Sequence, residues 1–295
     1  MDRRQLLKYL ISSAVVVGSG MNSVEAWAGR LRIRGSSQPA TEAAPPIGSI
    51  QDSGSDGDYL DKMEKFYEPH SDDISLVGEQ LSLLEGCWLK LKKVSDLIGF
   101  GNFNIIGFDD FRKTCQNYAS VGTLTAAELA FLEELYYRDA EVYGFYGARV
   151  FKEITAEIPG KDIVQLENGQ YLYQGHAFDL YQKLRSHIGN SLMMTSGIRS
   201  VTKQLYLFID KAIRSRGNLS LSSRAIAPPG YSFHGIGDFD IGRYGWGARN
   251  FTKEFESTFE FKELYRLGYV KLRYPHGNLL GVRYEPWHVK TKPVV

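Results

Sequence analysis

The chain has 295 residues, of which 43% are hydrophobic and 23% charged, the balance of an ordinary globular protein with room for one or two domains. Its 35 lysines and arginines face 34 acidic residues, so it lacks the basic excess that binding to a phosphate backbone requires. This charge balance argues against nucleic acid as a partner. The aromatic content of 13% suits packed sheets as well as clefts for sugars or peptides, and does not choose between them.

The first 28 residues have the pattern of an export signal. Residues 3–8 supply three basic side chains, residues 9–17 a short apolar run, and residues 26–28 an A-x-A cleavage site. The paired arginines resemble a twin-arginine signal. A membrane anchor is the alternative, but the run is short and rich in serine and glycine for a hydrocarbon layer of about 30 Å. We therefore expect cleavage after Ala28, no stable membrane span afterwards, and a periplasmic or cell-envelope location.

A linker and a helical region follow the signal. Residues 29–57 are rich in Ser, Gly, Pro and Ala, which predicts a flexible linker. Residues 58–159 carry apolar side chains three and four apart, and Thr125 and Glu128 form a capping-box pattern, so we expect helices here. Cys87 and Cys115 could form a disulfide in an exported protein or remain buried thiols, and the sequence leaves both open.

The pattern changes after residue 159. Short apolar runs predict strands over 170–173 and 192–195, and helical spacing predicts helices over 177–188, 201–213 and 251–267. Residues 269–274 and 279–284 look like a hairpin around a turn at 275–278. Helices mixed with strands that run back antiparallel to one another predict an α+β fold. We therefore divide the mature chain into a helical region over 58–159 and a second domain over 160–295.

The second domain holds the residue types that a zinc hydrolase requires. Such an enzyme uses three His, Asp or Glu ligands, an open position for water, and a nearby carboxylate that moves a proton. His234 and Asp240 lie six residues apart around glycines, and Glu285 and His288 lie three apart near the end of the chain. Each pair alone is a weak signal. Together, with Pro286 and Trp287 between the last two, they form a strong one.

Three blocks make residues 192–290 resemble a known family. They are Ser196-Gly-Ile-Arg199-Ser200 followed by Gln204, then Pro229-Gly-Tyr-Ser232-Phe-His234, and finally Glu285-Pro-Trp-His288-Val-Lys290. In order and approximate spacing they are similar to the zinc D-alanyl-D-alanine carboxypeptidases and D-Ala-D-Ala dipeptidases of bacterial cell-wall metabolism. That group also holds L-Ala-D-Glu endopeptidases and the fold of hedgehog signalling domains. The resemblance implies a hedgehog/DD-peptidase-like domain with a central antiparallel sheet and flanking helices, preceded here by the helical region.

The resemblance also implies a metal site. Zn²⁺ would be held by His234, Asp240 and His288, and Glu285 would act as the catalytic base. One departure concerns the first two ligands, because the family usually spaces them by seven residues and this chain by six. Asp238 could therefore replace Asp240. The apolar residue that follows Asp240 matches the family pattern and favours Asp240.

Further roles follow from the same resemblance. Arg199 would stabilise the oxyanion or hold the substrate carbonyl, and Ser232, Ser196 and Gln204 would hydrogen-bond the peptide or its terminal carboxylate. The implied reaction is hydrolysis of peptide bonds in peptidoglycan stem peptides, most simply release of terminal D-Ala by a D,D-carboxypeptidase. Two alternatives stay open, a non-catalytic zinc-containing cell-wall binding module and an endopeptidase of the same fold. Glu285 argues against the first, because a structural zinc site needs no base.

Overall fold

The computed structural model describes residues 56–293. The predicted signal over residues 1–28, and all of the predicted linker except residues 56 and 57, lie outside the described residues. Those two residues already belong to helix α2, Asp56–Glu64. Among residues 56–293, no helix combines the length and the apolar character needed to cross a bilayer.

The region over 58–159 is helical, as predicted. After α2 it contains α3 (Glu79–Ile98), α4 (Phe100–Phe103), α5 (Phe108–Asn117), α6 (Ala126–Tyr137) and the 3-10 helix η1 (Ala140–Tyr143). The 3-10 helix η2 (Gly160–Asp162) follows directly after the region. The capping box at the start of α6 is confirmed, since the Thr125 hydroxyl accepts from the Glu128 N–H and the Glu128 carboxylate accepts from the Thr125 N–H. Cys87 and Cys115 are both free and buried.

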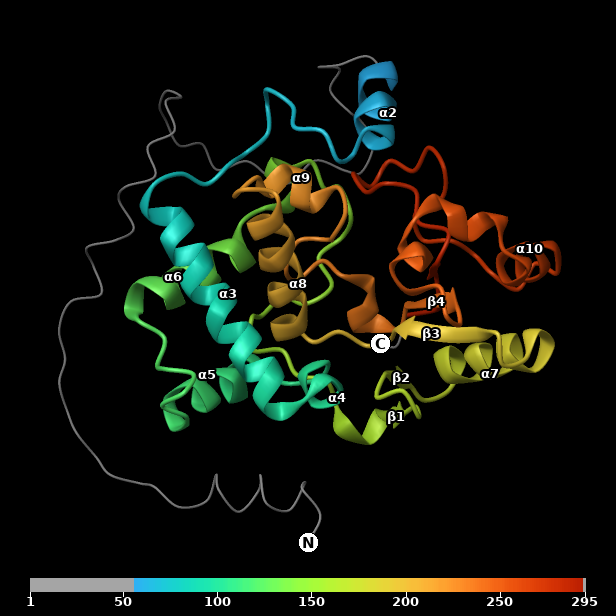
Figure 1. The fold of residues 1–295 in the computed structure, drawn as a ribbon, viewed down its shortest axis with the longest axis horizontal. Helices are drawn as coiled ribbons and strands as arrows, with labels where there is room; N and C mark the ends of the chain where they lie inside the picture. Colours follow the sequence, from blue (N-terminus) through green and yellow to red (C-terminus); the bar gives the residue numbers. More distant parts are fainter. Residues whose placement is uncertain (1–55, 294–295) are drawn as a thin grey trace, which may run out of the picture. The chain divides into compact units, whose positions relative to one another are not determined.

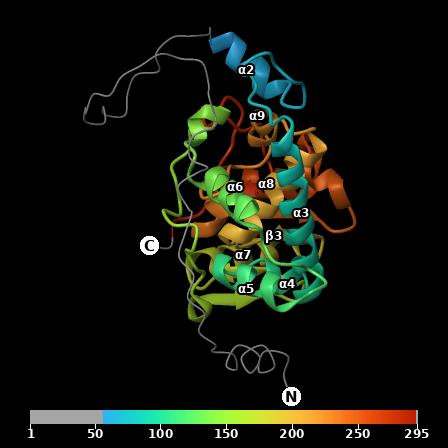
Figure 2. The same cartoon turned by 90° about the vertical axis from the view of Figure 1, so that its left-hand side faces the viewer.

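The helical region shares a hydrophobic core with the chain that follows. Helix α8 (Val201–Arg214) packs against α3, and Figures 1 and 2 both show the two helices side by side with α6 next to α3. Leu84 and Leu91 of α3 belong to the same buried cluster as Leu205 and Phe208 of α8. The division between residues 159 and 160 therefore does not coincide with a gap in the packing.

The second half confirms the α+β prediction and its antiparallel sheet. Its elements are β1 (Ile163–Gln165), β2 (Tyr171–Tyr173), α7 (His176–Ile188), β3 (Leu192–Ser196), α8, α9 (Leu219–Ser223), η3 (Phe233–Ile236), β4 (Phe239–Arg243), η4 (Gly247–Phe251), η5 (Lys253–Ser257), α10 (Phe259–Arg266) and β5 (His288–Val289). Strands β1 and β2 pair with each other, and the second sheet has the order β3-β4-β5, all antiparallel. The strands predicted at 170–173 and 192–195 and the helices predicted at 177–188 and 201–213 are all present.

The single helix predicted over 251–267 is wrong. The chain forms η4, η5 and α10 there, with Thr252 and Thr258 in extended conformation between them. The Thr252 hydroxyl accepts from the Glu254 N–H, and the Thr258 hydroxyl accepts from the Phe261 N–H. Each threonine therefore caps a new helical start, which ends the helix before it.

The predicted hairpin is also wrong. Residues 269–274 pair mainly with the end of the chain, through hydrogen bonds from the Arg273 N–H to the His288 carbonyl (3.2 Å) and from the Lys290 N–H to the Lys271 carbonyl (2.7 Å). Residues 279–284 instead pack against residues 144–146, where the Tyr146 N–H donates to the Leu280 carbonyl at 3.0 Å and Gly281 lies too close to the Gly144 carbonyl for a Cβ to fit. A contact with a distant part of the chain therefore overrides the local hairpin signal.

A buried ion pair ties the N-terminal segment to the end of α9. Arg224 donates to both carboxylate oxygens of Asp73 at 2.7 and 3.0 Å, and each side chain is 2% exposed. Burial opposes ionisation of Asp73, but the hydrogen bonds from Arg224, the His70 N–H and Asn218 together outweigh it and lower the Asp73 pKa.

Replacement of Arg224 by Met should leave the buried Asp73 carboxylate without its bidentate partner, with only the Lys62 ammonium nearby at 3.8 Å. We expect the free energy of unfolding to fall by about 3–5 kcal/mol in urea titrations. The matched control is Asp72→Asn, because Asp72 pairs with Lys62 but its side chain is 73% exposed. That variant should change stability by about 1 kcal/mol or less. Equal losses in the two variants would contradict the prediction.

Lys203 is a second buried charge in the helical core. It is 8% exposed, and its ammonium lies 5.0 Å from the Phe100 ring centroid, 5.5 Å from Phe103 and 5.8 Å from Tyr206. Burial, with a smaller contribution from the charge of Arg199, lowers the pKa of Lys203 to about 8. The same lysine in the unfolded chain titrates near its usual pKa of about 10.4.

This difference predicts a pH dependence of stability. Between about pH 8 and pH 10 the unfolded chain binds more protons at Lys203 than the folded chain, so the contribution of this group rises with pH. The gain should approach about 3 kcal/mol. Urea unfolding at about pH 7 and about pH 10 measures it, with Lys203→Met as the reference that lacks the group. The prediction fails if wild type and Lys203→Met respond equally to pH.

Candidate metal centre

The three-stranded sheet brings together residues that are far apart in the sequence. Asp240 on β4 pairs in register with Ser196 on β3 and with His288 on β5. Side chains alternate along extended chain, so Asp240 of β4 and Asp238, the residue just before the strand, project to one face while Phe239 projects to the other, into the apolar core. The polar site therefore lies on the opposite face of the sheet from the core.

His234 reaches the same face from the short helix η3. Its Nδ1 lies 2.8 Å from the Gly197 carbonyl oxygen. Because a carbonyl can only accept, this contact places the imidazole hydrogen on Nδ1 and leaves the lone pair on Nε2. That Nε2 lies 3.3 Å from Asp240 Oδ1. The chain thus presents a free imidazole lone pair to a carboxylate.

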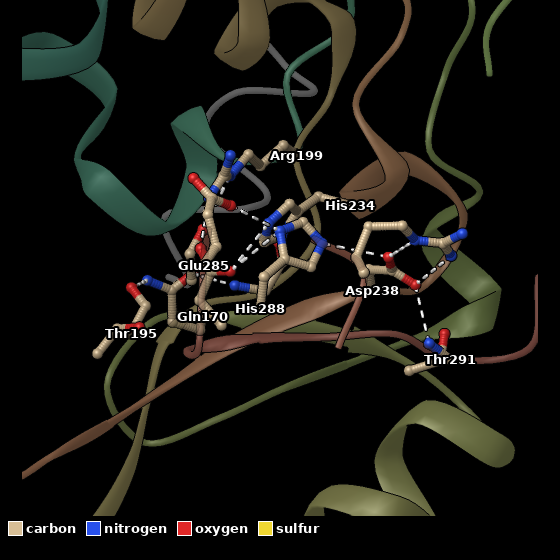
Figure 3. Close-up of polar contacts among 12 residues, drawn as sticks. Gln170, Thr195, Arg199, His234, Asp238, Glu285, His288 and Thr291 are labelled. Atoms are coloured by element: carbon tan, nitrogen blue, oxygen red, sulfur yellow. Dashed lines mark hydrogen bonds and ion pairs between the residues drawn. The ribbon is translucent and has the colours of Figure 1, made fainter. Parts of the chain in front are cut away.

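His288 is oriented by two acidic partners. Its Nε2 lies 3.1 Å from Asp238 Oδ2, and its Nδ1 lies 3.3 Å from Glu285 Oε2 and 3.6 Å from Asp240 Oδ1. Figure 3 shows Asp238 on one side of the His288 ring and Glu285 on the other. The contact with Asp238 fixes the ring and directs Nδ1 toward Asp240 and His234, as carboxylates do for metal-binding histidines.

The donor atoms of this cluster fit a zinc ion. One ligand atom from each of His234, Asp240 and His288 can be chosen so that all three lie within 4.8 Å of one another, and all three residues are buried. His234 Nε2 and Asp240 Oδ1 are buried without a hydrogen-bond partner among the described residues. Unpaired buried polar atoms are costly, and a cation between them would satisfy both. Two imidazoles and one carboxylate are a common donor set of catalytic zinc.

Asp238 has a different role in this geometry. Arg273 donates to both of its oxygens at 2.7 and 3.0 Å, and the Thr291 N–H donates to Oδ1 at 2.9 Å. Together with His288 Nε2 these contacts occupy the carboxylate. The geometry therefore favours Asp240 over Asp238 as the candidate ligand and makes Asp238 the group that orients His288.

The pKa values of Asp238 and Asp240 are consistent with these two roles. Burial opposes ionisation of Asp238 and Asp240, but hydrogen bonds from His288 and Arg273 lower the pKa of Asp238 to about 2. The positive charge that His234 carries in acid, together with the charge of Arg199, lowers the pKa of Asp240. Both carboxylates are therefore anionic at neutral pH.

The two imidazoles differ in protonation. Burial, reinforced by the charge of Arg199, lowers the pKa of His234 to about 4, so its ring is neutral and able to donate a lone pair. For His288, burial also disfavours the charged form, but the hydrogen bonds with Asp238 and Glu285 outweigh it and raise the pKa to about 9. A metal ion at the site would take the place of that extra proton.

The cluster opens into a pocket. Its lining includes both histidines, Asp240 and Glu285, with Arg199 and Ser232 on the wall. Arg199 donates from Nη2 to Asp240 Oδ2 at 2.7 Å and from Nε to Ser196 Oγ at 2.9 Å. The arginine is therefore fixed beside the candidate ligand.

Two residues implied by the resemblance lie outside the lining. The Ser196 hydroxyl accepts from Arg199 and holds it in position. Gln204 donates from Nε2 to the Ala227 carbonyl at 2.6 Å, and Ala227 in turn lines the pocket. Both residues therefore support the pocket wall in this structure.

Three partners of the site were not predicted. Arg273 and Thr291 hold Asp238, and Arg283 lines the pocket beside Glu285. For Arg273 and Thr291 no sequence signal exists, since neither lies in a recognised block. For Arg283 a signal was present, because a residue two positions before Glu285 in extended chain shares its face.

The comparisons with known proteins agree with the blocks. Residues 173–293 match the family model of VanY, D-alanyl-D-alanine carboxypeptidase. The search of curated proteins gave no match.

Several solved structures are similar to part of the chain. The LdcB LD-carboxypeptidase has 24% identity and a TM-score of 0.38, covering 46% of this chain and 69% of that one. VanYB in complex with D-alanine-D-alanine has 26% identity and a TM-score of 0.35, covering 45% and 80%. A VanY D,D-pentapeptidase in complex with Zn(II) has 26% identity and a TM-score of 0.35, covering 45% and 82%. Each similarity covers less than half of this chain.

Proposed function

We propose, on the premise that residues 173–293 form a VanY-type D-alanyl-D-alanine carboxypeptidase domain, that this protein is a zinc peptidase acting on peptidoglycan stem peptides. The finer proposal is that it is a D,D-carboxypeptidase, which removes the terminal D-Ala. One observation carries the proposal. Two imidazoles and a carboxylate, with unpaired atoms on His234 and Asp240, lie in the same pocket as a further carboxylate, Glu285.

His234, Asp240 and His288 would hold the zinc ion. When bound, zinc polarises the peptide carbonyl and acidifies a water molecule. Arg199, fixed by Asp240 and Ser196, offers its remaining N–H groups to the negative charge that develops on the carbonyl oxygen.

Glu285 is suited to move the proton. Its carboxylate lines the pocket, and its Oε2 lies 3.3 Å from His288 Nδ1. It can accept a proton from the attacking water and pass it to the amine that leaves. A purely structural zinc site has no use for such a group.

The substrate test uses the zinc-loaded protein and a stem pentapeptide ending in D-Ala-D-Ala, with products followed by mass spectrometry. We expect loss of a single D-Ala, abolished by a chelator and restored by zinc. Release of the D-Ala-D-Ala dipeptide would instead indicate a peptidyl-dipeptidase, and cleavage of cross-linked dimers alone would indicate an endopeptidase. A protein that binds zinc and muropeptides but cleaves neither would be a binding module, and the proposed enzyme function would be rejected.

Export remains part of this proposal. The basic start, the short apolar run and the A-x-A site of residues 1–28 support secretion by a twin-arginine-like route. Stem peptides lie outside the cytoplasm, so the proposed substrate requires it. N-terminal sequencing of protein recovered from the cell envelope should begin after Ala28, and a change of Arg3 and Arg4 to Lys should retain the precursor inside the cell.

A further inference from the structure

The pocket contains two arginines that differ in how many of their donors are used. Arg199 donates from Nε and from Nη2, to Ser196 and Asp240. Within residues 56–293, the Arg283 side chain makes one hydrogen bond, from Nη2 to the Phe251 carbonyl at 3.2 Å. Its Nε is buried and has no hydrogen-bond partner among the described residues. Arg283 therefore uses fewer of its side-chain donors than Arg199 does.

The guanidinium of Arg283 is held in a defined place. Its Cζ lies 4.5 Å from the Phe66 ring centroid and 4.8 Å from that of Trp287, and the side chain is only 17% exposed. Burial lowers the pKa of Arg283, although the charges of Glu285 and Asp240 act in the opposite direction. A positioned cation that has lost water and keeps unused N–H groups is a binding site for an anion.

The acidic groups of the pocket do not accept hydrogen bonds from the unused N–H groups of Arg283. Arg283 Nε lies 3.8 Å from Glu285 Oε1, which is too long for a hydrogen bond. The other oxygen of Glu285 faces His288 at 3.3 Å. Asp240 is bonded to Arg199 and shared with the candidate metal site. An incoming anion would therefore meet unused donors on Arg283.

We propose that Arg283 binds the free terminal carboxylate of the peptide substrate and thereby makes the enzyme an exopeptidase. The inference rests on the proposed peptide hydrolysis and names the substrate class, a peptide with an unblocked carboxyl end. A fork of N–H groups matches the two oxygens of a carboxylate. Ser232, on the same wall, is the neutral donor that would share this anion. Ser196 and Gln204 lie outside the lining, so they are not its first contacts.

The helical region contributes to this feature. Phe66 lies outside the matched residues 173–293, yet its ring covers one side of the Arg283 guanidinium. The chain near Phe66 is itself tied down, because Arg224 donates to the Phe66 and Glu68 carbonyls. The region before the VanY-type domain thus helps to hold a specificity residue in place.

The experiment compares two peptides that differ only at the C-terminus, one ending in D-Ala carboxylate and the other in D-Ala carboxamide. Steady-state kinetics are measured for zinc-loaded wild type, Arg283→Met and Arg283→Lys. Arg266→Met is the matched control, because that arginine is 66% exposed and pairs only with Glu263 among the described residues. Zinc content and thermal melting establish that each variant is folded and loaded.

We expect wild type and Arg266→Met to favour the carboxylate peptide. Arg283→Met should lower kcat/KM for that peptide by about 10- to 100-fold, mainly through KM, and should leave the carboxamide peptide nearly unchanged. Arg283→Lys should restore part of the preference, because a cation returns without the fork. If Arg283 had only a structural role, Arg283→Met would instead lower kcat/KM for both peptides by the same factor.

Two results would overturn the inference while leaving the proposed hydrolysis intact. One is equal cleavage of both peptides by wild type, which would mark an endopeptidase. The other is an unchanged preference for the carboxylate in folded Arg283→Met. If zinc-loaded wild type cleaves neither peptide nor the stem pentapeptide, the proposed function itself fails and the inference fails with it.

Discussion

Glu285→Gln should lower kcat for D-Ala release by about 1,000-fold while zinc content stays at the wild-type level. Glutamine keeps the size of the side chain but cannot accept the proton of the attacking water, and general acid–base groups contribute about 10²–10⁴ in rate. Glu285 is buried at the pocket, with Oε2 3.3 Å from His288 Nδ1. The loss should therefore appear in kcat with little change in zinc binding.

The control for this variant is Glu254→Gln. Glu254 pairs with Arg249 at the surface, and its side chain is 59% exposed. It should retain wild-type kcat. Measurement requires D-Ala release under saturating substrate and metal analysis of the same samples. If Glu285→Gln keeps more than about a tenth of wild-type kcat, Glu285 is not the base.

The second large effect concerns zinc binding, which should respond differently to substitution of Asp240 and of Asp238. Asp240→Asn should lose stoichiometric zinc and, with it, nearly all activity, because Asp240 Oδ1 is one of the unpaired donors of the cluster. Asp238→Asn should keep zinc at saturating metal but bind it about 10- to 100-fold more weakly, because Asp238 acts through His288.

Competition with a chromogenic chelator measures both affinities, and added zinc tests rescue of activity. Asp238→Asn should recover activity as zinc rises, whereas Asp240→Asn should not. The reverse pattern would make Asp238 the ligand and Asp240 the residue that positions Arg199.

Local features of this chain were readable in advance. The capping box of Thr125 and Glu128 works over one turn of helix, and Gly189 ends α7 because it adopts a positive φ of 80°. Such signals depend only on neighbouring residues, so they can be read from the sequence where no distant contact competes with them. The α+β class, the antiparallel sheet and the family resemblance followed from the same kind of information together with the short blocks.

Contacts between distant segments were not readable. The predicted hairpin does not form because residues 269–274 hydrogen-bond with residues 288–290, and Gly281 packs against Gly144. The failure of the helix predicted over 251–267 has a local cause instead, because Thr252 and Thr258 cap new helical starts within it and the spacing of apolar residues does not record such caps.

The same distinction applies to the candidate site. The sequence alone determined which side chains could bind zinc, since His234, Asp240, Glu285 and His288 carry the necessary lone pairs and lie in recognisable blocks. Only the tertiary structure decided how they are used. It directs Asp240 toward both imidazoles and commits Asp238 to Arg273 and His288. It also brings the Arg283 guanidinium against the rings of Phe66 and Trp287, which are far apart in the sequence. The reason is physical: chemistry belongs to a residue type, but the partner that satisfies a buried charge is set by folding.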